Sequence, residues 1–524
     1  MFFRALAAAA AAAAARVPGS PLPFPSRGLN ASTTLLYITA DGLSPSDALT
    51  LATLQGALTR RLGRATLYRA STGSDYADLW APELAAGWGV AFDRSLGGDV
   101  WAAVARFNAS LAGYFIADLA DGSVNAAVAL CAARGGAVAV TAEGAPRAAA
   151  AGLAPLGDVR GRGLAWVLAT AGAGAFSTRV TLLQDPTKTG MSDWAVASGA
   201  LTWWVPDANA GLAPLVWGSM KAPFFALGWG PDERGTVNAA SAHGGGVIAT
   251  DWAENLDALS AFDAPRLAPR APPPPPPPPS APRHTAAFLL SDGDNVQWLL
   301  GGFARSTNFF GSPDRGAVPM GWTIAPSLVD LAPAAMRYFY DRATPLDAFV
   351  GGLSGAAYAY LDDAAGAPAG FAALTLATAQ KAGLEYVNVM TDGDTLAPGA
   401  AAALLGGDSA LAGLIHYSYA DYALGGNITF VGAKPVVRAR FNLWGDGSMG
   451  RNFFNTTQAA AALAAGARDP SVAAGYSLVV VHAWSHNVSD ARRVMDDVNA
   501  RAPGGVDFVT PTELMRRVAA NVRR

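Results

Sequence analysis

The sequence predicts an α/β protein in which small N-terminal α/β units precede a C-terminal (β/α) barrel-like domain. Short apolar or β-branched segments alternate with helical patterns along the chain. An uninterrupted run of prolines at 272–279 forms a stiff linker and marks the best domain boundary. The part after these prolines holds about eight strand candidates alternating with helices, which favours a barrel, including an irregular one.

Composition narrows the classes of partner. The chain has 524 residues, enough for roughly three or four domains, and 51% of them are hydrophobic, which supplies ample core. Charged residues make up 15% and the formal net charge is −3. Nothing in this balance indicates nucleic-acid binding or attraction to an anionic membrane, so a neutral partner is expected.

The N-terminus resembles a secretory signal, since Arg4 is followed by an alanine run at 7–15 that is too short to span a bilayer. An organellar transit peptide is the alternative. Cys131 is the one cysteine, which excludes an internal disulfide, and it is expected in the core. Five N-x-S/T sequons are compatible with the secretory route, at Asn30, Asn108, Asn427, Asn455 and Asn487.

Three βαβ units are expected before the linker. In the first, a strand at 34–39 precedes a helix that Ser44 begins, with Pro45 at its first position and a leucine stripe up to Gly63. A strand at 66–68 completes it. In the second unit, strands at 113–117 and 137–140 flank a helix at 123–134. In the third, strands at 224–227 and 247–249 flank a helix that runs to His243.

The domain boundaries follow from these units. The expected segments are a leader at 1–20, three α/β units at 30–100, 101–175 and 176–266, a Pro-rich linker at 267–283 and the barrel-like domain at 284–524. The expected barrel strands are 286–290, 322–324, 348–350, 386–389, 414–416, 436–441, 478–481 and 506–509, and the last helix opens with a Thr-Pro-Thr-Glu capping box at 510–513.

Several segments carry a family resemblance. They read LSPSDALTLATLQGALTRR, LAGYFIADLADGSVNAAVAL, LGWGPDERGTVNAASAHGGGVIATDWAENL, SDGDNVQW, GWTIAPSLVDLAP and VVHAWSH. With them the chain resembles the GxGYxYP glycoside hydrolases. Its own form of the naming motif, at 355–361, keeps Gly355, Tyr358 and Tyr360 but has Ala357 and Leu361. The resemblance implies three small N-terminal domains and a barrel-like C-terminal domain, and it assigns no catalytic residues.

Two Asp-Gly-Asp turns are the candidate catalytic groups. Asp292 and Asp294 follow the strand at 286–290, and Asp392 and Asp394 follow the strand at 386–389. Barrel enzymes gather catalytic groups at the C-terminal ends of strands, and a glycosidase usually needs two carboxyl groups. The alternative is that these turns only cap helices. Asp446, in a glycine-rich loop, is a further acid for which a structural turn is favoured.

His482 and His486 offer an alternative chemistry. Four residues apart after the strand at 478–481, they would share one helix face and could join Asp292 or Asp294 around zinc or a similar divalent ion. That set suits a metal-dependent polysaccharide deacetylase, although its order along the chain differs from the usual one. No metal or cofactor is the first expectation, and core or hydrogen-bonding histidines are the competing interpretation.

Aromatic residues near strand ends are candidate sugar-binding groups, because their faces contact C–H groups while hydroxyl and indole groups hydrogen-bond. Core packing should account for at least half of them. Arg438 and Arg440 alternate on one strand face, where an inward pair could hold a carboxylate. The full substrate-binding set is Trp298, Trp322, Tyr358, Tyr360, Arg440, Trp444 and Trp484.

The expected function is a secreted hydrolase that acts on a neutral carbohydrate through carboxylates of the C-terminal domain. A metal-dependent deacetylase and a non-catalytic glycan-binding surface protein are the alternatives. No nucleic acid partner and no membrane span after leader removal are expected.

Overall fold

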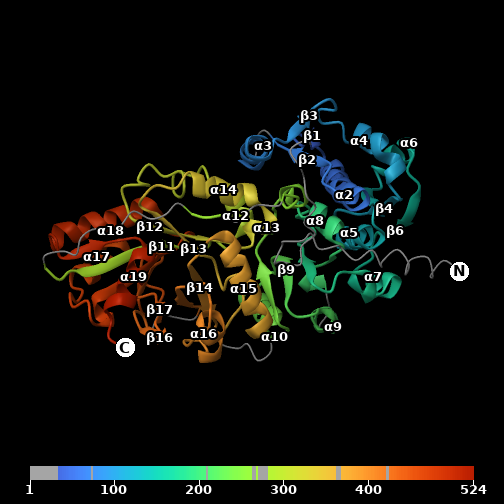
Figure 1. The fold of residues 1–524 in the computed structure, drawn as a ribbon. Coiled ribbons are helices and arrows are strands. Elements are labelled where there is room, and N and C mark those ends of the chain that lie inside the picture. Colours follow the sequence, from blue (N-terminus) through green and yellow to red (C-terminus); the bar gives the residue numbers. More distant parts are fainter. Residues whose placement is uncertain are drawn as a thin grey trace. The chain divides into compact units, whose positions relative to one another are not determined.

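The computed structural model describes residues 33–71, 75–207, 211–262, 267–269, 281–361, 368–419 and 424–524 (Figure 1). The expected leader, Asn30 and the proline run at 272–279 lie outside these described residues. The chain divides into two compact units, one formed by the chain up to Ala264 with Asp330–Met336 and the other by Pro265–Val329 with Arg337–Arg524. No helix of the described residues is long and apolar enough to cross a membrane.

The first sheet of the N-terminal unit forms around the strand expected at 34–39. Ser44 caps α2 by accepting the N–H of Asp47 at 3.1 Å, and Gly63 ends that helix in a left-handed conformation, as the sequence predicts. The strand order is β2-β1-β3 and both pairings are parallel. The elements are β1 (Thr34–Thr39), α2 (Pro45–Leu62), β2 (Leu67–Ala70), α3 (Asp75–Trp88), β3 (Ala91–Asp93) and α4 (Val100–Phe107).

The second sheet has the order β5-β4-β6, again with parallel pairings. The helix expected at 123–134 is α5, and Cys131 is fully buried in it, which confirms Cys131 as a core residue. The elements are β4 (Gly113–Ala117), α5 (Ser123–Arg134), β5 (Ala137–Thr141), α6 (Ala145–Ala150), β6 (Pro155–Asp158) and α7 (Leu164–Ala171).

The third sheet has the order β10-β9-β7-β8. The sequence analysis predicts β9 and β10 but not β7 or β8. The elements are β7 (Val180–Leu183), α8 (Ser192–Ser198), β8 (Leu201–Trp203), α9 (Leu212–Ser219), β9 (Phe224–Gly228), α10 (Glu233–Ala242), β10 (Gly245–Ile248) and α11 (Leu256–Leu259).

Helices α2 and α8 pack closely at Gly56. A Cβ atom at this position would lie 2.1 Å from the carbonyl oxygen of Asp193 and 2.9 Å from Cβ of Val196. Only glycine allows the two backbones to approach this far. The contact therefore joins the first α/β unit of the chain to the third.

The second unit is built on one 11-stranded sheet of order β16-β17-β15-β14-β13-β12-β11-β20-β18-β19, with β21 paired to β11. Within the described part of this sheet, only the pairing of β16 with β17 is antiparallel. The strands are β11 (His284–Leu290), β12 (Met320–Ile324), β13 (Asp347–Gly351), β14 (Tyr386–Thr391), β15 (Gly413–Ser418), β16 (Ile428–Val431), β17 (Lys434–Arg438), β18 (Phe441–Leu443), β19 (Phe453–Phe454), β20 (Tyr476–Val481) and β21 (Val506–Phe508).

This sheet curls into an irregular barrel-like form, which confirms the expected fold class. All eight expected strands are present, but the one at 436–441 is split into β17, which pairs with β15, and β18, which pairs with β20. Between them, Ala439 N–H donates to the carbonyl of His416 at 3.1 Å and Arg440 N–H donates to that of Leu478 at 2.8 Å. One chain segment thus links strands from opposite ends of the sheet order.

Helices follow most strands of this unit, and α17 and α18 pack side by side in its C-terminal part (Figure 1). Thr510 caps the last helix by accepting the N–H of Glu513 at 3.4 Å. The helices of this part of the chain are α12 (Val296–Leu300), α13 (Leu328–Leu331), α14 (Pro333–Asp341), α15 (Pro368–Ala382), α16 (Pro398–Leu405), α17 (Thr456–Ala464), α18 (Val488–Arg501) and α19 (Pro511–Asn521). The end of α13 and the start of α14, within Asp330–Met336, belong to the first unit.

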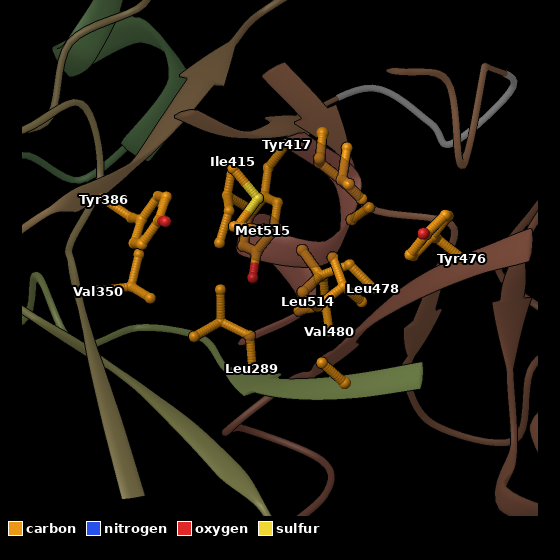
Figure 2. Packing of buried hydrophobic residues seen from close by; sticks show 14 of the residues in the cluster. Leu289, Val350, Tyr386, Ile415, Tyr417, Tyr476, Leu478, Val480, Leu514 and Met515 are labelled. Carbon is orange, nitrogen blue, oxygen red and sulfur yellow. The ribbon is translucent and has the colours of Figure 1, made fainter. Parts of the chain in front are cut away.

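The core of the second unit lies on the concave side of the curled sheet (Figure 2). Leu514 and Met515 of α19 are completely buried among side chains from several strands. These strand residues include Leu289, Val350, Ile415, Leu478 and Val480. Because side chains alternate along a strand, this cluster defines which positions face the interior of the barrel.

Candidate active site

The turn after β11 is fixed by close backbone packing. Gly293 N–H donates to Oγ1 of Thr323 at 2.8 Å, and a Cβ atom on Gly293 would lie 1.7 Å from the carbonyl oxygen of Thr323. A Cβ atom on Gly352 would lie 3.1 Å from the backbone N of Asp294. The turn therefore lies across the C-terminal ends of β12 and β13, where no larger residue would fit at 293.

Asp292 has a left-handed backbone (φ 67°) that turns its side chain back toward Ser291 and the segment after β20. Ser291 Oγ donates to the Asp292 carboxyl, and the Trp484 side chain and Ala483 backbone also hydrogen-bond to it. Burial outweighs these hydrogen bonds and raises the pKa of Asp292 to about 6. The sequence singled out Asp292 but not Ser291, although Ser291 precedes it directly.

His482 is an ionisable neighbour of Asp292. Its Nε2 lies 3.8 Å from Oδ2 of Asp292, and its ring centroid lies 3.3 Å from that of Trp444. Burial, together with the nearby His486, lowers the pKa of His482 to about 3, so the imidazole is neutral at neutral pH. Its Nδ1 is buried and has no hydrogen-bond partner among the described residues. The nitrogen is also closed to solvent, so the edge of His482 that faces Asp292 is its Nε2.

His486 does not join this pair. Its Nδ1 hydrogen-bonds to Oδ2 of Asp490 at 3.1 Å and its Nε2 to the carbonyl of Gly445 at 3.2 Å. The contact with Asp490 holds the start of α18, which Asn487 caps, and the contact with Gly445 ties it to the loop after β18. No group of three or more His, Cys, Asp or Glu residues in the described part of the chain could hold a metal ion. The alternative ligand set of Asp292, Asp294, His482 and His486 is not assembled.

Asp392 and Asp394 follow β14, three positions from β11 in the sheet order. Asp394 is exposed and forms an ion pair with Arg438, whose guanidinium lies 3.0 Å from its carboxyl. Val437 and Ala439 belong to the interior cluster, so Arg438 between them points to the outer face. Asp394 is therefore bound on the outside of the barrel, whereas Asp392 is partly buried.

Arg440 is also directed away from the interior. Its guanidinium donates to the carbonyls of Tyr476 at 3.0 Å and Ala473 at 2.9 Å. The expected alternation of Arg438 and Arg440 on one face is thus correct, but that face is the outer one. Arg440 serves to hold backbone carbonyls and does not orient Asp292.

The two remaining acidic residues, Asp294 and Asp446, differ in how far they are buried. Asp294 is buried, and its backbone packs against Gly352. Asp446 is exposed and accepts the N–H of Ser448 at 3.0 Å, which is the structural turn that the sequence favoured. Asp294 thus remains a candidate for the interior, while Asp446 shapes the loop after β18.

The aromatic candidates fall into two groups. Trp484 is 57% exposed, and its ring centroid lies 5.1 Å from that of the half-buried Trp298. Trp484 hydrogen-bonds to Asp292 and Trp444 packs against His482, so two indoles contact this pair, with Trp298 behind Trp484. Such faces are suited to the C–H side of a sugar ring.

The second group is core. Trp322 is 1% exposed and its indole donates to Oδ1 of Asp347 at 2.7 Å. Tyr358 and Tyr360 are buried, with their hydroxyls 3.3 Å apart. These three side chains present no face to solvent, which matches the expected share of core packing.

The fold and this cluster define a multidomain α/β protein with an acidic, aromatic-lined site at the strand ends of a barrel-like domain. Family models match residues 282–519 ("GxGYxYP putative glycoside hydrolase C-terminal domain"), 178–261 ("GxGYxYP third domain") and 111–171 ("GxGYxYP_N second domain"). The chain belongs to the GxGYxYP family, as its motifs predict.

A solved structure has the same fold. It is described as a putative hydrolase from Bacteroides thetaiotaomicron VPI-5482, with a TM-score of 0.85, 24% identity and coverage of 97% of this chain and 98% of that chain. No curated protein matches.

Proposed function

We propose that the chain hydrolyses glycosidic bonds of a neutral glycan, with Asp292 as the general acid. The observation that carries this proposal is the Asp292 carboxyl at the end of β11, whose pKa burial raises to about 6. Glycosidases use such a carboxyl to protonate the leaving oxygen while a second carboxylate acts as nucleophile or base. The family, the low net charge and the indoles beside Asp292 support a neutral carbohydrate.

The candidates for the second carboxylate are Asp294 and Asp392. Asp394 is unsuited because Arg438 holds it on the outer face. Asp294 shares the turn with Asp292 and is buried. His482 would act beside Asp292 through its Nε2, which lies 3.8 Å from Oδ2 of Asp292. The deacetylase alternative loses support because His486 is engaged elsewhere.

The test is turnover of a panel of neutral polysaccharides and nitrophenyl glycosides by wild-type protein and by Asp292→Asn. Loss of general-acid catalysis should lower kcat about 10²- to 10⁴-fold. Asp394→Asn is the matched control and should keep kcat, and whichever of Asp294→Asn and Asp392→Asn also loses turnover is the second carboxylate. Glycan binding without turnover, unchanged in Asp292→Asn, would instead identify a non-catalytic binding protein.

We further propose that the chain enters the secretory route, on the basis of the signal-like N-terminus and the sequons. The N-terminal sequence of protein recovered from the expressing cells and from their medium tests this. A mature N-terminus near residue 20 in the medium is expected, whereas processed protein inside an organelle would support the transit-peptide alternative.

A further inference from the structure

A network of buried polar side chains joins the first α/β unit to the third, beside the helix contact at Gly56. Its members are no more than 5% exposed, although they include two acids and one arginine. Buried charges are costly unless they are paired and hydrogen-bonded, so the contacts of this network constrain its protonation. The members are Gln55 and Thr59 of α2, Arg69 of β2, Asp193 of α8 and Asp257 of α11.

Asp257 belongs to the third unit but is held by donors of the first. Gln55 Nε2 donates to Oδ1 of Asp257 at 2.5 Å, and Thr59 Oγ1 donates to Oδ2 at 2.6 Å. The other end of the Gln55 amide accepts from Nε of Arg69 at 2.7 Å. Each oxygen of the Asp257 carboxyl therefore has a fixed partner on α2, and Gln55 connects this carboxyl to Arg69.

Asn255 fixes the loop that carries Asp257. Its backbone is left-handed (φ 61°), a conformation that asparagine tolerates better than most residues. Its side-chain oxygen accepts the N–H of Arg69 at 2.8 Å, and its Nδ2 donates to the carbonyl of Arg69 at 2.7 Å. The Asn255 amide thus occupies both backbone groups of one β2 residue, which sets the position of Asp257 against α2.

The carboxyls of Asp193 and Asp257 hydrogen-bond to each other, and two carboxyls do so only when one of them holds a proton. Burial raises the pKa of Asp257 well above its usual value, and the charge of Asp193 raises it further. Burial also raises the pKa of Asp193, but Arg69, whose Nη2 lies 3.4 Å from Oδ2 of Asp193, opposes this. Asp257 is therefore the acid of the pair and Asp193 the carboxylate.

Arg69 is the cation that both carboxyls share. Its neighbour Tyr68 points to the opposite face of β2 and stacks on Tyr37, with ring centroids 6.1 Å apart. Glu254, three residues before Asp257, acts electrostatically on Tyr68. Arg60, near the end of α2, lies against Gly199 at the end of α8. With one proton, the two carboxyls and Arg69 carry no net charge, and without it they carry one negative charge.

We infer that Asp193 and Asp257 share one proton and that this proton holds the first α/β unit against the third. With the proton, Asp257 donates to Asp193 and the network is balanced. Without it, two buried carboxylates face one guanidinium, and the contact loosens. Opening of the contact passes the proton to water, so the contact is strongest in acid and weakens as the pH rises. This device lies within the N-terminal unit and is independent of the proposed hydrolysis.

Hydrogen exchange of the α2 and α8 backbone amides in the full chain, expressed as protection factors, tests this inference. The unfolded Asp257 has the usual pKa of 3.8, so opening releases one proton at any pH between 3.8 and the raised pKa of the folded state. Wild-type protection should fall by up to about tenfold per pH unit in this range. Asp257→Asn keeps an N–H donor for Asp193 but cannot titrate, so it should lose this pH dependence.

Asp47→Asn is the matched control, because Asp47 is also on α2 but pairs with Arg147 at 3.1 Å. This variant should keep the wild-type pH dependence. Infrared spectra of wild type at neutral pH should show the C=O stretch of a protonated carboxyl, which Asp292→Asn should retain and Asp257→Asn should lack. The wild-type band needs no variant to fold. Absence of the band, or equal pH dependence in wild type and Asp257→Asn, would overturn the inference. Stabilisation of wild type by calcium would also overturn it, since a cation would then join the carboxyls.

Discussion

Oδ2 of Asp292 lies 3.8 Å from Nε2 of His482, although the two residues are 190 positions apart in the chain. The pairing of β11 with β20 is parallel and places Leu290 opposite Val481, so both side chains leave their strands at the same edge. Burial raises the pKa of Asp292 to about 6 and lowers that of His482 to about 3. On acidification the pair therefore takes its first proton at Asp292.

Activity should fall as the pH rises through about 6. Below this pH the Asp292 carboxyl holds the proton that a general acid must donate, and above it the proton is lost, so kcat/KM should drop about tenfold per pH unit on this limb. The pH profile of kcat/KM on the best substrate of the panel measures it. A profile that stays flat from pH 5 to pH 8 would contradict the assignment of Asp292.

The raised pKa of Asp292 should make the stability of the folded protein depend on pH. The pKa of Asp292 is raised from 3.8 to about 6 on folding, so the folded state binds the proton more tightly than the unfolded state. The resulting stability is fully present below pH 3.8 and is lost as the pH rises to 6, at a cost of about 3 kcal/mol.

Asp292→Asn cannot titrate, so the free energy of unfolding of this variant minus that of wild type should increase by up to about this amount between pH 3.5 and pH 7. Denaturant unfolding at both pH values measures the difference. A difference that is independent of pH would show that Asp292 titrates normally.

Trp484 has two proposed roles, a hydrogen bond to Asp292 and an aromatic face for the sugar, and two substitutions test them separately. Its hydrogen bond lowers the pKa of Asp292, although burial raises that pKa more, so Trp484→Phe should move the descending limb of the pH profile to higher pH while keeping an aromatic face. Trp484→Ala should in addition raise KM by roughly tenfold, since the sugar-facing ring is lost. If both variants keep the wild-type KM and pH profile, Trp484 has no part in the site.

The sequence predicted the strands of the second unit well, because parallel barrel strands buried on both faces read as short apolar runs with clear breaks. It missed β16 and β19, which are short and lie at the ends of the sheet order. It also joined β17 and β18, since nothing local to 436–441 shows that the strand changes partners.

The candidate site was predicted less completely. Strand ends indicated Asp292 and His482, but the sequence does not distinguish the two Asp-Gly-Asp turns. In the structure Asp394 of the second turn pairs with Arg438. Arg438 points outward because Val437 and Ala439 on either side of it pack inward, and the sequence alone does not show this. Likewise, His482 and His486 share a helical spacing, yet the segment between β20 and α18 is not helical and Asp490 binds His486 instead.

Chelation of metal ions should leave activity unchanged. His486 contacts Asp490 and Gly445 through its two ring nitrogens. No group of three or more His, Cys, Asp or Glu residues in the described part of the chain could hold a metal ion, whereas catalytic zinc requires three protein ligands. Activity before and after dialysis against EDTA, with elemental analysis of the purified protein, provides the measurement. One zinc per chain whose removal abolishes turnover would restore the deacetylase alternative.

The contact between α2 and α8 predicts opposite effects for two glycine-to-alanine substitutions in helices. Gly56→Ala places Cβ 2.1 Å from the carbonyl oxygen of Asp193, so the helices must separate, at a cost of about 1–3 kcal/mol. Gly218→Ala, in α9, meets no atom within 4 Å and should stabilise by about 0.4–1 kcal/mol, because alanine restricts the unfolded chain more than glycine does. Thermal unfolding should therefore show a lower Tm for Gly56→Ala and an unchanged or higher Tm for Gly218→Ala. Equal shifts in both variants would mean that helix propensity, and not the close approach at Gly56, determines the effect.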